Sequence, residues 1–167
     1  MKGILEAAPK LKRGLVVGGP PCQPFSGVNP KRKGFEDPKS GCIQKFVDLV
    51  EMCRRVGPHI KWESLMENVA SMTGSDREAV TEIVSQAYAT TPYRVEASIL
   101  GPVNRPRLYW TSFEFTAAEF VKEDTGKGYV EVSRKKGWIP DASGFLDKGV
   151  EKCGTKPFPT CEIGRAH

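Results

Sequence analysis

The first half of the chain alternates short apolar runs with longer segments whose apolar residues recur at helical spacing. Residues 14–18 form an apolar run closed by glycines, which predicts a strand buried on both faces. A loop rich in Pro, Gly and Lys follows at 20–40. The next segment has an apolar stripe at every third or fourth position, so a helix is predicted that ends at Gly57 and Pro58. The stripe consists of Ile43, Phe46, Val47, Val50 and Cys53.

The same alternation continues through a second strand and a second helix. Residues 62–69 predict a strand, and Ser75 lies three residues before Glu78, which is the spacing of a capping box. One apolar stripe lies behind that cap, formed by Val80, Ile83, Val84, Ala87 and Tyr88. We therefore expect a helix that starts near Ser75 and packs through one face.

Two further strands are predicted at 93–100 and 108–115. The seven residues between them are too few for a crossover helix, so this pair is expected to be antiparallel. The element order indicates an α/β protein, namely part of a Rossmann-like sheet with helices on both faces and an antiparallel hairpin at the end. From about Thr116 the periodicity fades, and 127–128 and 134–137 are predicted as loops.

Composition limits the class of protein. A length of 167 residues corresponds to about one domain, and 39% hydrophobic residues exclude a chain that is disordered throughout. Lys and Arg number 25 against 20 Asp and Glu, and this net charge of +5 is compatible with an anionic partner. Five cysteines without a Cys-x-x-Cys pair, with only two histidines, favour neither a disulfide framework nor a metal site. We find no signal-peptide core and no apolar run of membrane-spanning length, and predict a soluble intracellular protein without membrane contact.

A thiol follows the first predicted strand directly. Cys22 lies within Gly18-Gly-Pro-Pro-Cys-Gln-Pro24, where prolines fix the backbone on both sides and glycines permit close approach of another molecule. Such a loop can hold a nucleophile rigidly. A small buried apolar residue in a structural turn is the alternative interpretation.

Charged residues follow the later strands. Glu67 ends the second strand, and the two parallel strands flank one crossover, so their carboxyl ends should be neighbours with the thiol and the carboxylate facing one crevice. Arg105 and Arg107 are two positions apart, which places both side chains on one face of an extended segment. Exposed strand-end charges are the alternative for each of them.

Taken together, these segments resemble a known family. Pro20-Pro-Cys-Gln-Pro-Phe-Ser26, Glu67-Asn-Val69 and Arg105-Pro-Arg107 occur in the order and approximate spacing of the (cytosine-5)-methyltransferases, which use S-adenosylmethionine. Residues 28–34, 67–72 and 107–110 look like the eukaryotic de novo DNA methyltransferases. The resemblance covers roughly Leu15 to Phe115 and implies the class I methyltransferase fold.

The resemblance assigns roles to four catalytic residues. It implies that Cys22 adds covalently to carbon 6 of cytosine, which makes carbon 5 able to accept a methyl group from S-adenosylmethionine. Glu67 matches the family residue that stabilises ring nitrogen 3. Arg105 and Arg107 match the arginines that hold the exocyclic oxygen of the base.

The resemblance also implies double-stranded DNA as partner, a nuclear location and a base flipped out of the duplex. Ser26, Val28 and Asn29 align with the loop that closes on DNA. Lys31, Arg32 and Lys33 are expected to contact phosphates, with a solvated basic loop as the alternative. A homo-oligomer or a hetero-oligomer is the candidate assembly of the full-length protein.

The sequence departs from the family pattern in several places. Val103 stands where the family has Gln, and the Phe-x-Gly-x-Gly cofactor loop would precede residue 15. We therefore divide the chain into the central part of a catalytic domain at 1–115, a loop-rich start of the target-recognition region at 116–161, and a non-native tail at 162–167. The codons that can encode this tail resemble a sequencing adapter. This fragment is expected to be inactive alone, without an identifiable cofactor-binding residue.

Two other functions remain open on the sequence. The tRNA cytosine-5 methyltransferases share the Pro-Pro-Cys-Gln-Pro-Phe segment and the same thiol chemistry. A non-catalytic DNA-binding or accessory relative belongs to a different class, and the intact Cys22, Glu67 and Arg107 argue against it.

Overall fold

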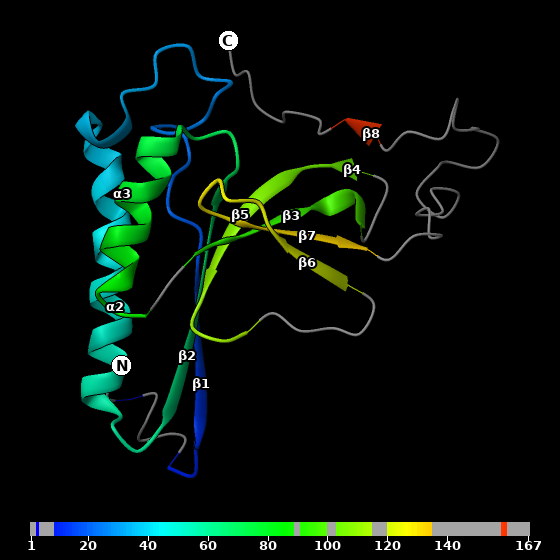
Figure 1. Cartoon of the computed structure of the whole chain (residues 1–167). Coiled ribbons are helices and arrows are strands. Elements are labelled where there is room, and N and C mark those ends of the chain that lie inside the picture. Colours follow the sequence, from blue (N-terminus) through cyan, green and yellow to red (C-terminus); the bar gives the residue numbers. More distant parts are fainter. Residues whose placement is uncertain are drawn as a thin grey trace, which may run out of the picture.

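The computed structural model describes residue 3 and residues 9–88, 91–99, 103–114, 120–134 and 158–159. Its centre is a six-stranded sheet in the order β1-β2-β5-β3-β7-β6, with helices α2 and α3 side by side along it (Figure 1). The sheet strands are β1 (Arg13–Gly18), β2 (Lys61–Val69), β3 (Tyr93–Glu96), β5 (Pro106–Thr111), β6 (Phe120–Asp124) and β7 (Val130–Arg134). The helices are α2 (Cys42–Val56) and α3 (Gly74–Ser85), with short 3-10 turns η1 (Gly34–Glu36), η2 (Pro38–Gly41) and η3 (Ala97–Ile99). A separate pair joins β4 (Val103–Asn104) to β8 (Phe158–Pro159).

Strand pairing follows the sequence prediction around the first helix and the late hairpin. β1 and β2 are parallel, with Gly18 opposite Met66, so their carboxyl ends are neighbours. β5 is antiparallel to β3 and also inserts beside β2, where Glu67 lies opposite Tyr109. The mixed α/β class and the antiparallel pair are thereby confirmed.

One core lies between the sheet and the two helices. Val16, Met66 and Trp110 point into it from three adjacent strands, and the last two are fully buried. The predicted stripe of α2 supplies the other wall, with Ile43 and Val50 fully buried. Apolar residues at helical spacing therefore pack as expected.

The opposite face of β1 differs from the prediction. Leu15 is 56% exposed and Val17 is 62% exposed, so the strand is buried on one face and not on both. The reason is that α2 and α3 both pack on the other face of the sheet, where they share a single core. Among the described residues, both α helices cover the same face, so the prediction of helices on both faces of the sheet is not met there.

Helix α3 begins earlier than the capping box at Ser75 predicts. Thr73 is the N-cap, and its hydroxyl oxygen accepts a hydrogen bond from the Asp76 backbone N–H at 3.1 Å. Thr73 also donates to the Asp76 carboxylate at 2.7 Å. Both Thr73 and Ser75 precede an acidic residue by three positions, and the extended backbone at Thr73 makes it the cap.

A hairpin of β6 and β7 occupies the region where the periodicity fades. Its turn includes the predicted loop at Lys127 and Gly128, and Gly126 and Gly128 both adopt positive φ. Four of the five β6 residues are exposed, which explains why no alternating apolar pattern marks this strand. Only Val132 of β7 is buried in the hairpin.

The proposed division of the chain is described only in part. The boundary at 115–116 and the tail at 162–167 lie outside the described residues, as do Cys153 and Cys161, and these assignments stay predictions. Among the helices that the structure describes, none combines the length and apolar character needed to span a membrane.

Candidate active site

The thiol lies in a tightly folded loop after β1. The Cys22 carbonyl accepts hydrogen bonds from the backbone N–H groups of Phe25 at 2.9 Å and Ser26 at 2.8 Å. Phe25 is fully buried and meets Phe35 edge-on, with 5.2 Å between ring centroids. The Cys22 side chain is half-buried and packs against the core. These contacts hold the thiol in one place, as the prolines predict.

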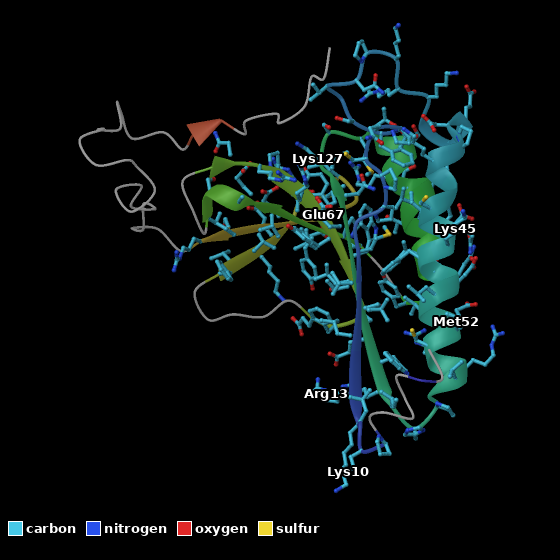
Figure 2. All side chains as sticks on the ribbon, turned by 180° about the vertical axis from the view of Figure 1, so that it is seen from behind. Lys10, Arg13, Lys45, Met52, Glu67 and Lys127 are labelled. Atoms are coloured by element: carbon cyan, nitrogen blue, oxygen red, sulfur yellow. The ribbon has the colours of Figure 1, made fainter. Side chains whose placement is uncertain are left out.

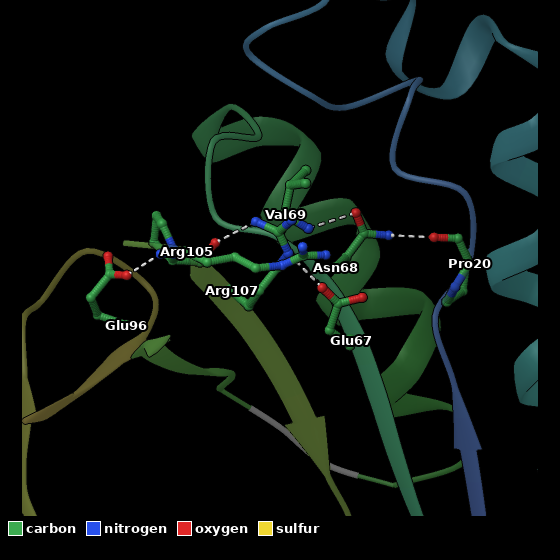
Figure 3. A network of polar contacts seen from close by, with 8 residues as sticks. Pro20, Glu67, Asn68, Val69, Glu96, Arg105 and Arg107 are labelled. Atoms are coloured by element: carbon green, nitrogen blue, oxygen red, sulfur yellow. Dashed lines mark hydrogen bonds and ion pairs between the residues drawn. The ribbon is translucent and has the colours of Figure 1, made fainter. Parts of the chain in front are cut away.

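Glu67 and Arg107 form an ion pair at the carboxyl end of β2 (Figure 3). The Nε of Arg107 lies 2.7 Å from Oε1 of Glu67. The two side chains are 33% exposed for Glu67 and 19% exposed for Arg107, so water screens the pair only in part. Arg107 also donates from a terminal nitrogen to the Pro106 carbonyl at 2.9 Å. The guanidinium therefore holds one carboxylate oxygen in a defined direction.

Contacts at Gly19 and Asn68 bring the thiol loop against this carboxylate. A Cβ at Gly19 would lie 3.3 Å from Oε2 of Glu67, so the backbone at the start of the loop passes beside the second carboxylate oxygen. Asn68 is fully buried and donates to the Pro20 carbonyl at 3.4 Å, while its own oxygen accepts from the Val69 backbone at 2.8 Å (Figure 3). The loop that carries Cys22 thus starts beside the Glu67 side chain, as expected from the neighbouring carboxyl ends of β1 and β2.

The two arginines have different surroundings. Arg107 is largely buried against Glu67, whereas Arg105 is exposed at the start of the β5 segment. The backbone N–H of Arg105 donates to the Glu96 carboxylate, and its carbonyl accepts from Ala97 at 3.3 Å. Sequence spacing predicted two equivalent guanidiniums, and the structure distinguishes them by burial.

The predicted nucleic-acid contacts lie in the loop after Cys22. Val28 is 60% exposed, and the three basic residues that follow it are exposed as well. Asn29 folds this loop, because its side chain donates to the Gln23 carbonyl at 2.9 Å and accepts from the Lys31 backbone at 3.0 Å. Ser26 accepts from the Val28 N–H at 3.4 Å. Asn29 is therefore occupied by the loop itself.

Tyr109 is a further member of the site that the sequence did not indicate. It lies opposite Glu67 in the register of β2 and β5. Burial raises the pKa of the Tyr109 hydroxyl, and the Glu67 carboxylate adds to this, while Arg107 and Arg105 act in the opposite direction. Only the strand register, which joins positions 42 apart in the chain, places this phenol beside the ion pair.

The described residues do not bring three or more His, Cys, Asp or Glu side chains together as a metal site would need. The chemical groups at this edge of the sheet are instead a half-buried thiol, a carboxylate held by a guanidinium, and a phenol. A thiol can form a covalent bond to carbon, and a directed carboxylate can exchange a proton or hydrogen bond with a heterocycle.

A family model described as C-5 cytosine-specific DNA methylase matches residues 6–137. The chain belongs to this family. Its match includes the thiol loop, the Glu67 strand and the Arg107 strand. The family resemblance inferred from the three motifs is confirmed.

Proteins similar to this chain include proteins of phages and bacteria. It is 35% identical over 101 residues to the orphan methyltransferase M.SPRI of Bacillus phage SPR, covering 57% of this chain and 21% of that protein. It is 32% identical over 117 residues to the type II methyltransferase M.AplI of Arthrospira platensis, covering 66% of this chain and 31% of that protein. It is 38% identical over 103 residues to the type II methyltransferase M.AquIA of a Picosynechococcus species, covering 57% of this chain and 39% of that protein.

The matched part of this chain spans between about a fifth and two fifths of the length of these relatives. A crystal structure of a Spodoptera frugiperda DNMT2 mutant is similar with a TM-score of 0.45 and 18% identity, covering 90% of this chain and 44% of that one.

Proposed function

We propose that the chain carries the reaction groups of a DNA cytosine-5 methyltransferase that works through a covalent cysteine adduct. The observation that supports this most directly is the Glu67–Arg107 ion pair beside Gly19, where the Cys22 loop begins. Membership of the cytosine-5 methylase family supports methyl transfer to cytosine. The bacterial and phage relatives are named as type II or orphan methyltransferases.

In the proposed reaction, the Cys22 thiolate adds to carbon 6 of cytosine and forms a carbon–sulfur bond. The electron pair of the 5,6 double bond moves into the 4,5 bond, and the pair of the 3,4 double bond moves onto ring nitrogen 3, where Glu67 stabilises it by a proton or hydrogen bond. Carbon 5 then takes the methyl group as its bond to the donor sulfur breaks. A water molecule then takes the proton from carbon 5, the Cys22 thiolate leaves as the 5,6 double bond re-forms, and ring nitrogen 3 returns its proton to Glu67, so atoms and electrons balance.

S-Adenosylmethionine supplies the methyl group in this proposal. Among the described residues, the carboxylate at the carboxyl ends of β1 and β2 is Glu67, and one of its oxygens is paired with Arg107. The described residues therefore do not fit the ribose and adenine of that molecule. We infer that it is bound by residues other than those described.

The exposed loop between Cys22 and Gly34 supports DNA as the substrate. Val28 is the exposed apolar side chain that can enter the space left by a flipped base. Lys31 and Lys33 are exposed cations suited to phosphates. With the resemblance to the eukaryotic de novo branch, these features also lead us to propose a nuclear location.

Covalent trapping tests this function. The longest natural polypeptide that contains residues 1–161 is mixed with S-adenosylmethionine and duplex DNA containing 5-fluorocytosine, in which the fluorine prevents release of Cys22. We expect a denaturant-resistant complex that Cys22→Ser abolishes and Cys42→Ser retains, because Cys42 is a half-buried thiol on α2.

Three results would contradict the proposal in different ways. A complex that persists in Cys22→Ser would remove this thiol as the nucleophile. Trapping on 5-fluorocytosine tRNA but not on DNA would assign the chain to the tRNA branch. DNA binding without any trapped complex would indicate the non-catalytic accessory function.

A further inference from the structure

The thiol loop touches the segment between β2 and α3 at several points. The Gly27 backbone N–H donates to the Ser71 hydroxyl oxygen at 2.9 Å. Arg32 donates from its guanidinium to the Ser71 carbonyl at 3.3 Å. Ser71 thus holds two positions of the loop at once, one through its side chain and one through its backbone.

The approach at Gly27 leaves little room for a side chain. A Cβ at Gly27 would lie 3.1 Å from the Cβ of Ser71 and 3.3 Å from its carbonyl oxygen. Farther along, Gly34 has φ of 56° and passes beside the Asp76 carboxylate, where a Cβ would lie 2.8 Å from Oδ1. The loop therefore lies along residues 71–76 and does not extend freely into solvent.

A short chain of contacts connects Gly27 to the thiol. Phe25 and Ser26 both donate to the Cys22 carbonyl, and the Gly34 N–H donates to the Pro24 carbonyl at 2.9 Å, which closes the base of the loop. Phe25 is fully buried and anchors this base. The backbone hydrogen bonds thus fix the base of the loop near Cys22, and the Ser71 contact attaches the part at Gly27.

We propose that Ser71 is a positioning residue that closes the Cys22 loop over the reacting thiol through the hydrogen bond from Gly27. The inference rests on the proposed function for its role in methyl transfer, but the closure is a property of the loop itself. The hydrogen bonds described for Ser71 reach Gly27 and Arg32 and not the thiol or the ion pair, so Ser71 acts through Gly27. The guanidinium of Arg32 reinforces the same contact from the other side of the loop.

Alkylation of Cys22 in the 167-residue chain tests the closure directly. Wild type, Ser71→Ala, Ser71→Thr and the control Ser85→Ala are treated with iodoacetamide, and each cysteine is followed by peptide mass spectrometry. Ser85 is the last residue of α3, and its hydroxyl donates to the Glu82 carbonyl within that helix. It therefore lies at the opposite end of α3 from Ser71. We expect Cys22 to react about fivefold faster in Ser71→Ala, which matches the net strength of one neutral hydrogen bond. Ser71→Thr keeps the hydroxyl and should restore the slow rate.

Buried Cys53 is the internal reference for global unfolding. An unchanged Cys53 rate with faster Cys22 alkylation supports the closure, and an equal acceleration of both thiols would overturn it. An unchanged Cys22 rate in Ser71→Ala would also overturn it. Faster hydrogen exchange at the Gly27 amide is the second expected readout.

Turnover by the longest natural polypeptide separates the two proposals. Ser71→Ala should lower kcat for methyl transfer by about fivefold with little change in KM for the methyl donor. If wild type forms no trapped complex but the alkylation result holds, the proposed function fails and the loop closure stands. If trapping succeeds and alkylation does not respond to Ser71, the closure fails alone.

Discussion

The Nε of Arg107 donates to Oε1 of Glu67 across 2.7 Å, joining residues that are 40 positions apart in the chain. The register of β2 and β5 produces this pair, because Val69 lies opposite Arg107 and Glu67 lies two residues before Val69 on the same face. Two adjacent strands thus bring the carboxylate and guanidinium together. The second carboxylate oxygen is left beside the thiol loop at Gly19.

Glu67→Gln should separate chemistry from binding. The amide keeps the shape of the carboxylate but loses its charge and its ability to accept or return a proton, so methyl transfer is expected to fall by about 10²- to 10⁴-fold. Nucleic-acid affinity, measured by fluorescence anisotropy, should change by less than about threefold. The matched control is Glu63→Gln, which lies on the same face of β2 and pairs with Arg13 at 3.0 Å. Equal losses of rate and affinity would indicate a structural role.

Gly18→Ala should destabilise the fold at the start of the thiol loop. A Cβ there would lie 2.5 Å from a ring carbon of Phe46, a residue of the packed core. We expect a loss of about 1–3 kcal/mol in the free energy of unfolding, measured by urea denaturation. Gly41→Ala is the control, since nothing lies within 4 Å of its Cβ position. A loss of the same size in Gly41→Ala would show that steric contact at Phe46 is not the cause.

Arg77→Ala should loosen the β6–β7 hairpin. The Arg77 guanidinium donates to the Lys127 carbonyl and lies 5.2 Å from the centroid of the Tyr129 ring. Losing a charged hydrogen bond and a cation–π contact is expected to lower the free energy of opening the hairpin by about 1–3 kcal/mol. Hydrogen exchange at β7 amides should therefore accelerate, whereas Arg55→Ala on the exposed side of α2 should not change it. Unaltered exchange in Arg77→Ala would refute the contact as the anchor of the hairpin.

Stability at alkaline pH should depend on Tyr88. Burial raises the pKa of its hydroxyl to about 12, partly offset by the charge of Arg54. The unfolded chain releases this proton near pH 10 and the folded chain only near pH 12, so unfolding is favoured increasingly as pH rises between these values. Each unit of pKa difference corresponds to about 1.4 kcal/mol. Urea denaturation from pH 9 to 12 should show a steeper loss in wild type than in Tyr88→Phe, and parallel curves would contradict the prediction.

Much of the fold follows from short-range patterns. The stripe at Ile43, Val47 and Val50 predicts α2, and the Gly57-Pro58 pair predicts its end, because spacing and backbone restriction act within a few residues. The β6–β7 hairpin was missed for the same reason. Its strands carry few apolar residues and depend on Arg77 and on pairing of β7 with β3.

The sequence predicted which residues belong to the site better than it predicted how they are arranged. Cys22 and Glu67 follow the ends of adjacent strands, so the sequence indicated one common edge. The different burial of Arg105 and Arg107 and the part played by Tyr109 depend on where β5 inserts. No local pattern encodes that insertion, since β5 could pair with β3 alone.

The sequence by itself determined which segments become α2, β1 and β2, and which residues can carry thiol and carboxylate chemistry. These features depend on side-chain type and on spacing within one element. Only the tertiary structure decided that Arg107 pairs with Glu67, that Ser71 holds Gly27, and that one face of β1 stays open. Each of these contacts joins distant positions through strand order and packing, and an ion pair or hydrogen bond forms only when that packing brings donor and acceptor within reach.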